Sequence, residues 1–372
     1  MNSAFGIIYT GDSLPEMGEL TRSRSISALP IGGRYRVIDL LLSNLVNAGI
    51  GNVGVMCQRN YHSLMDHLGD GREWDLSRKR DGLFMLPPFV SSENHGDYSG
   101  ILDGLNSNIN YLRRSPQKYA ILVGSSTLYN IDFNEVLAYH RERNSDVTVL
   151  CCRQRGISPI PENQVYLDLD EEGRVRDVEI NPQMPHYHTI MISTMIIEKD
   201  LLLYVIDYAL SHNRTDLIRD VLQSNLGDYR IYAYEHTGYV KTILSATDFF
   251  EANMDLLNGD VRRELLMGPR PVRTKVKDEV PAKYLTEAHA SNSLLADGCV
   301  VSGSIENSVL FRGVRVGLGS IIRNSIIMQG CSIGDGCELE NVILDKNVYV
   351  KSGQRLIGTK NYPLIVKKNM MI

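Results

Sequence analysis

A six-residue repeat near the carboxyl end of the chain restricts the folds that this part of the chain can adopt. Small or turn-forming residues separate aliphatic residues six positions apart, at Leu295 and Val301, at Ile321, Ile327, Ile333 and Leu339, and at Val342 and Val348. In a parallel β-helix, one apolar residue in six points inward on each flat face. We therefore predict a left-handed parallel β-helix of hexapeptide repeats over residues 289–372.

Hexapeptide acyltransferases are an alternative class with such coils, and they use a histidine as general base within the coil region. Here His289 precedes the first clear coil, and no histidine follows it. The repeat therefore has a structural role in our interpretation. Because the faces and ends of β-helices pack against other subunits, we expect an oligomer.

The first part of the chain alternates between strand-like and helix-like segments. We predict strands at 4–11, 52–57, 119–124 and 147–152, and helices at 35–48, 103–114 and 133–143. This alternation favours an α/β domain with a mostly parallel, Rossmann-like sheet over residues 1–260. Prolines among many charges indicate a linker over 261–288. In such a sheet, ligands bind past the carboxyl ends of the strands.

Composition narrows the class of protein further. The net charge of the 372 residues is −5, which gives no indication of nucleic-acid binding. No apolar run approaches the ~18 residues of a membrane helix, and the N-terminus lacks the features of a secretory signal. The six cysteines form no C-x-x-C pair. We expect a reduced, cytoplasmic protein without membrane or nucleic-acid partners.

Two segments carry a resemblance to a known family. PIGGRYRVIDLLLSNLVNAGI (30–50) resembles the P-F-G-G-K-Y-R-I-I-D-F…S-N-C-x-N-S-G-I signature of ADP-glucose pyrophosphorylase, or glucose-1-phosphate adenylyltransferase. KYAILVGSSTLYNIDF (118–133) resembles the strand and loop that hold the catalytic Mg²⁺ in sugar-nucleotide pyrophosphorylases. The resemblance implies a GT-A-like nucleotidyltransferase domain followed by a β-helix.

Several positions depart from the chemistry that this family needs. Serine or threonine replaces the two metal-binding aspartates, isoleucine replaces two phosphate-binding lysines, and glutamate replaces the arginine of the glycine-rich loop, at Ser125 (or Ser126), Thr242, Ile26, Ile180 and Glu16. Hydroxyl groups are poor substitutes for anionic Mg²⁺ ligands. Other parts of the nucleotide and sugar-phosphate pocket persist, at Gly11, Gly100, Asp103, Gly124 and Glu179.

This pattern resembles the GlgD-type subunit of bacterial glucose-1-phosphate adenylyltransferase. It implies a regulatory subunit with no catalytic residues of its own and no tightly bound cofactor. It would modulate a catalytic partner, which uses Mg²⁺, within an allosteric heterotetramer for glycogen biosynthesis.

Three other interpretations remain: two enzymatic ones, and a structural or sensing module with no pyrophosphorylase partner. An active glucose-1-phosphate adenylyltransferase with an altered metal site would take its metal ligands from other carboxylates, at Asp12, Asp97, Asp103 or Asp132. The tetrapeptide starting at Gly11 also matches the start of GDSL-type hydrolases, with Ser13 as nucleophile. That fold needs a late Asp-x-x-His pair, which is absent from this sequence.

Four arginines point to an anionic effector. Arg24 and Arg36 occupy positions that line the effector site in the family, and Arg22 and Arg34 add positive charge beside them. Guanidinium groups suit a sugar phosphate or orthophosphate, because each can donate two parallel hydrogen bonds. Solvated arginines or structural ion pairs, such as Arg36 with Asp39, are the other interpretation.

Overall fold

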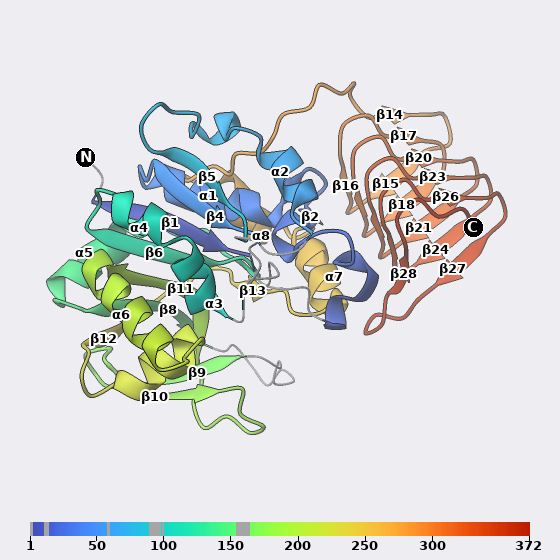
Figure 1. Cartoon of the computed structure of the whole chain (residues 1–372). Helices are drawn as coiled ribbons and strands as arrows, with labels where there is room; N and C mark the ends of the chain where they lie inside the picture. Colours follow the sequence, from blue (N-terminus) through green and yellow to red (C-terminus); the bar gives the residue numbers. More distant parts are fainter. Residues whose placement is uncertain (1–2, 11–14, 58–59, 89–97, 99, 154–163) are drawn as a thin grey trace.

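The computed structural model describes residues 3–10, 15–57, 60–88, 98, 100–153 and 164–372. An α/β domain forms one side of the molecule and a stack of β-coils forms the other, with helix α7 (Ala246–Asp255) beside the coils (Figure 1). This arrangement confirms the predicted fold class. No helix among the described residues has both the length and the apolar character needed to cross a bilayer.

A nine-stranded sheet forms the centre of the α/β domain, in the order β10-β9-β11-β6-β1-β4-β5, with β8 pairing β11 and β12. The bounds are β1 (Ala4–Tyr9), β4 (Asn52–Met56), β5 (Gly82–Leu86), β6 (Tyr119–Gly124), β8 (Val147–Arg153), β9 (Val165–Leu169), β10 (Val175–Ile180), β11 (Thr189–Glu198) and β12 (Ile231–Glu235). Strands β6, β1, β4 and β5 are parallel, as predicted. Strand β11 runs antiparallel to β6, β8 and β9, and β10 runs antiparallel to β9, so the sheet is mixed and the prediction of a mostly parallel sheet is wrong.

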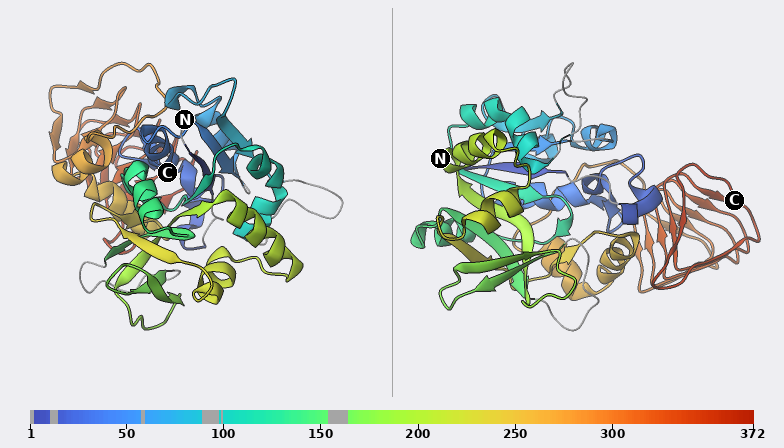
Figure 2. Two further views of the ribbon diagram at one scale, coloured as in Figure 1. Left: turned by 90° about the vertical axis from the view of Figure 1, so that its left-hand side faces the viewer. Right: turned by 60° about the horizontal axis from the view of Figure 1, so that its bottom comes forward.

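Helices cover both faces of this sheet (Figure 2). One face packs against α1 (Val37–Asn47), α2 (His62–Leu68) and α5 (Phe133–Glu142), and the other against α3 (Ile101–Ser107), α4 (Ile109–Arg114) and α6 (Lys199–Ser211). The helix predicted over 103–114 is divided at Asn108, whose side-chain amide donates to the carbonyl of Gly104. Such local bonds compete with the helical backbone pattern.

Short strands complete the α/β domain. The first two residues of the helix predicted over 35–48 form strand β3 (Tyr35–Arg36), which pairs with β2 (Pro30–Ile31). Helix α1 then begins where the Asp39 carboxylate accepts from the backbone N–H of Arg36, and it ends before Gly49, whose φ is 77°. Strands β7 (Thr127–Leu128) and β13 (Lys241–Thr242) form a separate antiparallel pair.

The repeat forms three five-stranded parallel sheets, which confirms the β-helix. Their strands are β14 (Lys283–Tyr284), β17 (Val300–Val301), β20 (Arg315–Val316), β23 (Ser332–Ile333) and β26 (Tyr349–Val350); β15 (His289–Ser291), β18 (Ser304–Glu306), β21 (Ile321–Arg323), β24 (Glu338–Glu340) and β27 (Arg355–Ile357); and β16 (Leu294–Leu295), β19 (Val309–Leu310), β22 (Ile326–Ile327), β25 (Val342–Leu344) and β28 (Leu364–Val366).

The register of the repeat differs from a strict period of six at one face. Arg315 pairs with Ser332, so this coil takes 17 residues (332 minus 315) rather than eighteen. One turn of this coil is therefore shorter by a residue, and the preceding coil, in which Val300 pairs with Arg315, takes 15 residues (315 minus 300). As a result Ile322, with 0% of its surface exposed, occupies the core position predicted for Ile321, which is half-buried.

The connection between the two parts is shorter than the linker predicted over 261–288. Helix α8 (Gly259–Arg262) and a π-helical turn (Arg263–Met267) continue the helical region. Strand β14 already pairs with β17. The residues between them, 268–282, form no helix or strand.

The two parts dock through a shared apolar cluster. Ile26 and Phe249 of the α/β domain belong to it together with Val309, Phe311 and Ile343 of the β-helix. Burial of such surface contributes roughly 25 cal/mol per Å².

A buried ion pair crosses the same interface, between Arg24 and Asp345. Both side chains are only 3% exposed. Because a lone buried charge is costly, each partner depends on the other.

We expect Arg24→Ala to lower the free energy of unfolding by about 3–5 kcal/mol, because it leaves the Asp345 carboxylate buried without its partner. Denaturant titration followed by fluorescence and circular dichroism measures this change. Arg22→Ala is the matched control, because Arg22 is exposed and pairs with Glu19 at the surface. Equal effects of the two variants would contradict a role for the buried pair in docking.

Candidate functional site

The two positions that correspond to the metal aspartates lie close together. Strand β7 pairs with β13 so that Thr127 faces Thr242, with their hydroxyl oxygens 3.2 Å apart. The next backbone N–H, of Ile243, donates to the carbonyl of Ser126 at 2.7 Å. Ser125 is buried at the end of β6. The fold thus brings the predicted positions together, but their side chains are hydroxyls.

At the positions where the family resemblance implies cationic phosphate ligands, the two isoleucines lie in apolar surroundings and the glutamate is exposed. Ile26 is 2% exposed and packs into the cluster between the two parts of the molecule. Ile180, at the end of β10, is partly buried and packs against the hydrophobic core on one face of the sheet. Glu16 is exposed in a 3₁₀ turn.

Two glycines of the predicted pocket lie where a side chain would collide. A Cβ at Gly100 would lie 2.4 Å from the carbonyl oxygen of Thr215. A Cβ at Gly124 would lie 2.6 Å from the Cβ of Ser193. Close backbone packing therefore explains both glycines. Gly11 lies outside the described residues.

The acidic residues of the predicted pocket occupy separate elements. Asp103 is in the first turn of α3. Glu179, in β10, accepts hydrogen bonds from the backbone N–H of His186 at 3.0 Å and from its ring Nδ1 at 2.5 Å.

Asp132, one of the alternative carboxylates, accepts from the N–H of Asn134 and begins α5. In the described part of the chain, no group of three or more His, Cys, Asp or Glu side chains is arranged to hold a metal. Asp12, Ser13 and Asp97 lie outside the described residues.

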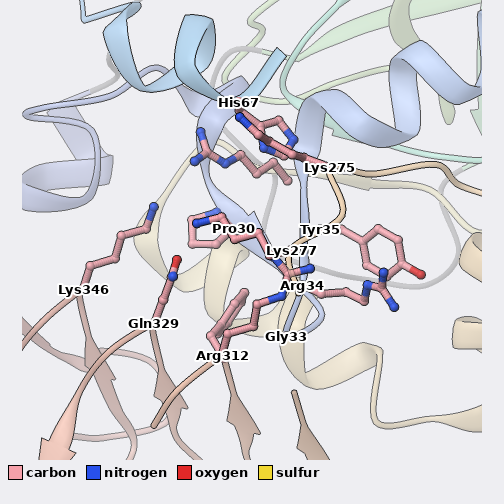
Figure 3. A pocket seen from close by; sticks show the side chains of 12 residues that line it. Pro30, Gly33, Arg34, Tyr35, His67, Lys275, Lys277, Arg312, Gln329 and Lys346 are labelled. Carbon is pink, nitrogen blue, oxygen red and sulfur yellow. The ribbon is translucent and has the colours of Figure 1, made fainter. Parts of the chain in front are cut away.

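A cationic pocket lies where the β2–β3 turn, the linker and the β-helix meet (Figure 3). Its volume is about 50 Å³, and by the same measure one water needs only about 10–15 Å³. Six cationic side chains line it together with other residues: Arg34, Arg36, Lys275, Lys277, Arg312 and Lys346, with Pro30, Gly33, Tyr35, His67, Phe311 and Gln329. Among its described lining residues there is no carboxylate.

Two of these cations, Arg312 and Lys346, form no ion pair within the described part of the chain, although carboxylates such as Asp297 and Asp345 lie near them. The Arg312 side chain is buried, and its Nε has no hydrogen-bond partner. Burial lowers the pKa of Arg312, and the nearby Arg34 lowers it further. Burial lowers the pKa of Lys346 to about 7, with added repulsion from Arg36 and Arg24. The arrangement therefore favours an anion, which would relieve both the burial cost and the mutual repulsion of the cations.

The four predicted arginines separate into two groups. Arg34 and Arg36 line the pocket, and Arg36 also donates to the carbonyl of Ser63 at 2.5 Å. Arg24 lies outside the lining, in its ion pair with Asp345. Arg22 lies at the surface beside Glu19.

Sequence reasoning missed the four other cations of the pocket. Lys275 and Lys277 form a T-K-V-K run in the linker, which was a usable signal. Arg312 and Lys346 belong to coil turns, and no local pattern marks them.

Family comparisons agree with this architecture. The model "Nucleotidyl transferase" matches residues 7–259, and "GlmU-like, C-terminal hexapeptide" matches residues 279–362. The chain belongs to the nucleotidyl transferase family. This confirms the family that the sequence motifs indicated.

Within the nucleotidyl transferase family, the chain is a homologue of GlgD proteins. It is 37% identical to "Glycogen biosynthesis protein GlgD" of Bacillus subtilis (strain 168), covering 100% of this chain and 97% of the relative. It is 40% identical to the protein of the same name from Geobacillus stearothermophilus, covering 99% and 96%. Identity to the glucose-1-phosphate adenylyltransferase of Clostridium botulinum (strain Alaska E43 / Type E3) is 32%, covering 85% and 82%.

We expect Lys346→Met to be more stable than the natural chain at pH 6, with an advantage that shrinks as the pH rises from 7 towards 10.5. The pKa of this lysine is about 7 when folded and 10.5 when unfolded. Over that interval the unfolded chain holds the extra proton, so the natural chain gains stability with pH. Chemical denaturation at several pH values measures the difference. A difference independent of pH would contradict a depressed pKa.

Proposed function

We propose that this chain is a regulatory subunit that associates with a catalytic glucose-1-phosphate adenylyltransferase in glycogen biosynthesis. The names of the relatives support the pathway and the partner. The partner carries out the chemistry with Mg²⁺, and this chain changes its activity within a heterotetramer. A subunit can do so only by favouring one state of its partner over another.

The pairing of β7 with β13 is the observation that carries this proposal. This strand pairing keeps the two predicted metal-site positions close together, but the residues at these positions are Ser125 and Thr242. Transfer to the α-phosphate needs charge neutralisation by a metal and by cations. The burial of Ile26 removes another cationic position. Loss of one electrostatic contact typically costs ~10²–10³ in rate, so several losses leave little activity.

We further propose that the cationic pocket is the effector site of this subunit. Its volume suits one phosphate-sized oxyanion, such as orthophosphate or the phosphoryl group of a sugar phosphate. The guanidinium groups of Arg36 and Arg312 supply donors, and Lys346 adds a charge that an anion stabilises. Because both parts of the molecule contribute these cations, an occupant strengthens their docking.

The kinetic test compares pyrophosphate release from ATP and glucose 1-phosphate by this chain alone, by the catalytic partner alone, and by the mixture. We expect the chain alone to reach less than about 1% of the partner's rate, since several electrostatic contacts are missing. We expect the mixture to exceed the partner alone.

A catalytic partner without its metal carboxylates is the control, and mixing it with this chain should yield no activity. Brisk turnover by the isolated chain would overturn the proposal.

The effector test uses sulfate, which keeps its charge across neutral pH. We expect Arg312→Gln to weaken sulfate binding by about tenfold or more, since hydrogen bonds to charged groups contribute ~1.5–3 kcal/mol. Isothermal titration calorimetry measures the affinity. Arg315→Gln is the matched control, because this arginine lies in the same coil but is exposed away from the pocket. Equal affinities of the two variants would contradict the assignment.

A further inference from the structure

A second and larger cavity lies between α7 and one corner of the β-helix. Its volume is about 670 Å³, which is within the range of small-molecule and cofactor sites. Its lining combines apolar residues near α7 with a column of asparagines: Phe250, Met254, Leu257 and Asn258, then Asn292, Asn307, Asn324 and Asn341, with Lys360. The cationic pocket shares none of these residues.

The asparagine column follows the stacking of the coils. Asn292, Asn307, Asn324 and Asn341 adopt left-handed backbone conformations, with φ of 41°, 47°, 44° and 51°. Each lies at the same corner of successive coils, next to strands that pair in register. Adjacent strands of a sheet are about 4.8 Å apart, so the column presents amide groups at a regular interval.

The backbone alone does not require asparagine at this corner. Glycine adopts positive φ at other corners, in one column at Gly298, Gly313 and Gly330 and in another at Gly319, Gly336 and Gly353. Glycine satisfies such a conformation without a side chain. The corner that faces the cavity instead has an amide in each of these four coils, which points to a role for the side chains.

Hydrogen bonding leaves much of the amide capacity unused. Asn292 donates to the side-chain oxygen of Asn307 at 2.7 Å, and Asn341 donates weakly to the carbonyl of Gly358 at 3.4 Å. Within the described part of the chain, the Asn324 side chain makes no hydrogen bond. An asparagine amide can donate two hydrogen bonds and accept two.

The corner offers no free strand edge to a peptide. The backbone N–H groups of Asn307, Asn324 and Asn341 donate to carbonyls of the preceding coil at 3.2, 3.1 and 3.3 Å. Peptides that add a strand to a sheet need unpaired backbone groups at its edge. A molecule at this wall would therefore meet the side-chain amides rather than unpaired backbone N–H groups.

The opposite wall of the cavity and the charges in its lining restrict the class of ligand further. Met254 and Leu257 are partly exposed, and they present apolar surface across from the amides. Lys360 is the one charged residue in the described lining, so the cavity differs from a phosphate or nucleic-acid site. A sugar unit has hydroxyl groups at its edges and C–H groups on its faces. A linear oligosaccharide repeats both at a regular interval.

We propose that this cavity binds a linear oligosaccharide, with its hydroxyl groups on the asparagine column and the faces of its rings against Met254 and Leu257. This site is distinct from the effector pocket and does not depend on the regulatory role. Because the relatives are glycogen biosynthesis proteins, the first probe is a linear α-1,4-glucan.

The test measures binding of maltoheptaose, cellohexaose and glucose to the full chain by isothermal titration calorimetry, without ATP or a partner subunit. We expect maltoheptaose or cellohexaose to bind, and glucose to bind much more weakly. We expect the double variant Asn307→Gly/Asn324→Gly to weaken binding about tenfold, which corresponds to about 1.4 kcal/mol. Glycine keeps the left-handed backbone, so the variant removes amides without strain.

Asn347→Gly is the matched control, because Asn347 has a φ of 58° but lies in another corner column. Its affinity should equal that of the natural chain, and thermal unfolding should show that both variants are folded. No saturable binding of either linear sugar up to about 10 mM would overturn the proposal. Equal weakening by the control, or an affinity for glucose equal to that for the longer sugars, would also overturn it.

Discussion

Docking of the β-helix onto the α/β domain is the contact on which the cationic pocket depends. Burial of apolar surface drives this docking, but the hydrophobic effect is not directional and does not select one relative orientation of the two domains. The buried pair of Arg24 with Asp345 adds direction, because its two charged groups lose their stabilisation when the domains shift apart at this point. Asp345 adjoins Lys346, so the residue that fixes the interface also places a cation of the pocket. The spacing of the cations is therefore a property of the interface rather than of either domain.

The strand pairing and the chemistry of the α/β domain are separable. The β7–β13 pair needs only backbone hydrogen bonds and suitable side-chain packing, and Thr127 opposite Thr242 satisfies both. A metal site needs anionic side chains at the same places. Hydroxyl side chains at these places still allow the strands to pair, but they do not supply the anionic ligands of a metal site. The family resemblance therefore predicts the fold, whereas the function depends on the individual side chains at the site.

Sequence patterns predicted the elements better than their relations. Periodicity located β1, α1 and the coils, because it reports which residues face the core. No strand was predicted at β11, and periodicity could not have shown its antiparallel direction, because alternation is the same in either direction. Nor could it show the shortened turn that moves Ile322 into the place of Ile321. Two of the six cations of the pocket were predicted: Arg34 and Arg36 lie in a motif, whereas Lys346 joins them only through docking.

Ile26 has become part of the structural core. It is 2% exposed within the cluster that joins the two domains, at a position where the family resemblance implies a phosphate-binding lysine. Returning a lysine to this place would put an ammonium group among aliphatic side chains, at a cost of several kcal/mol unless it found a partner. Such a substitution would thus loosen the interface between the two domains. A lysine at this position is compatible with the docked arrangement only if the side chains around it change as well.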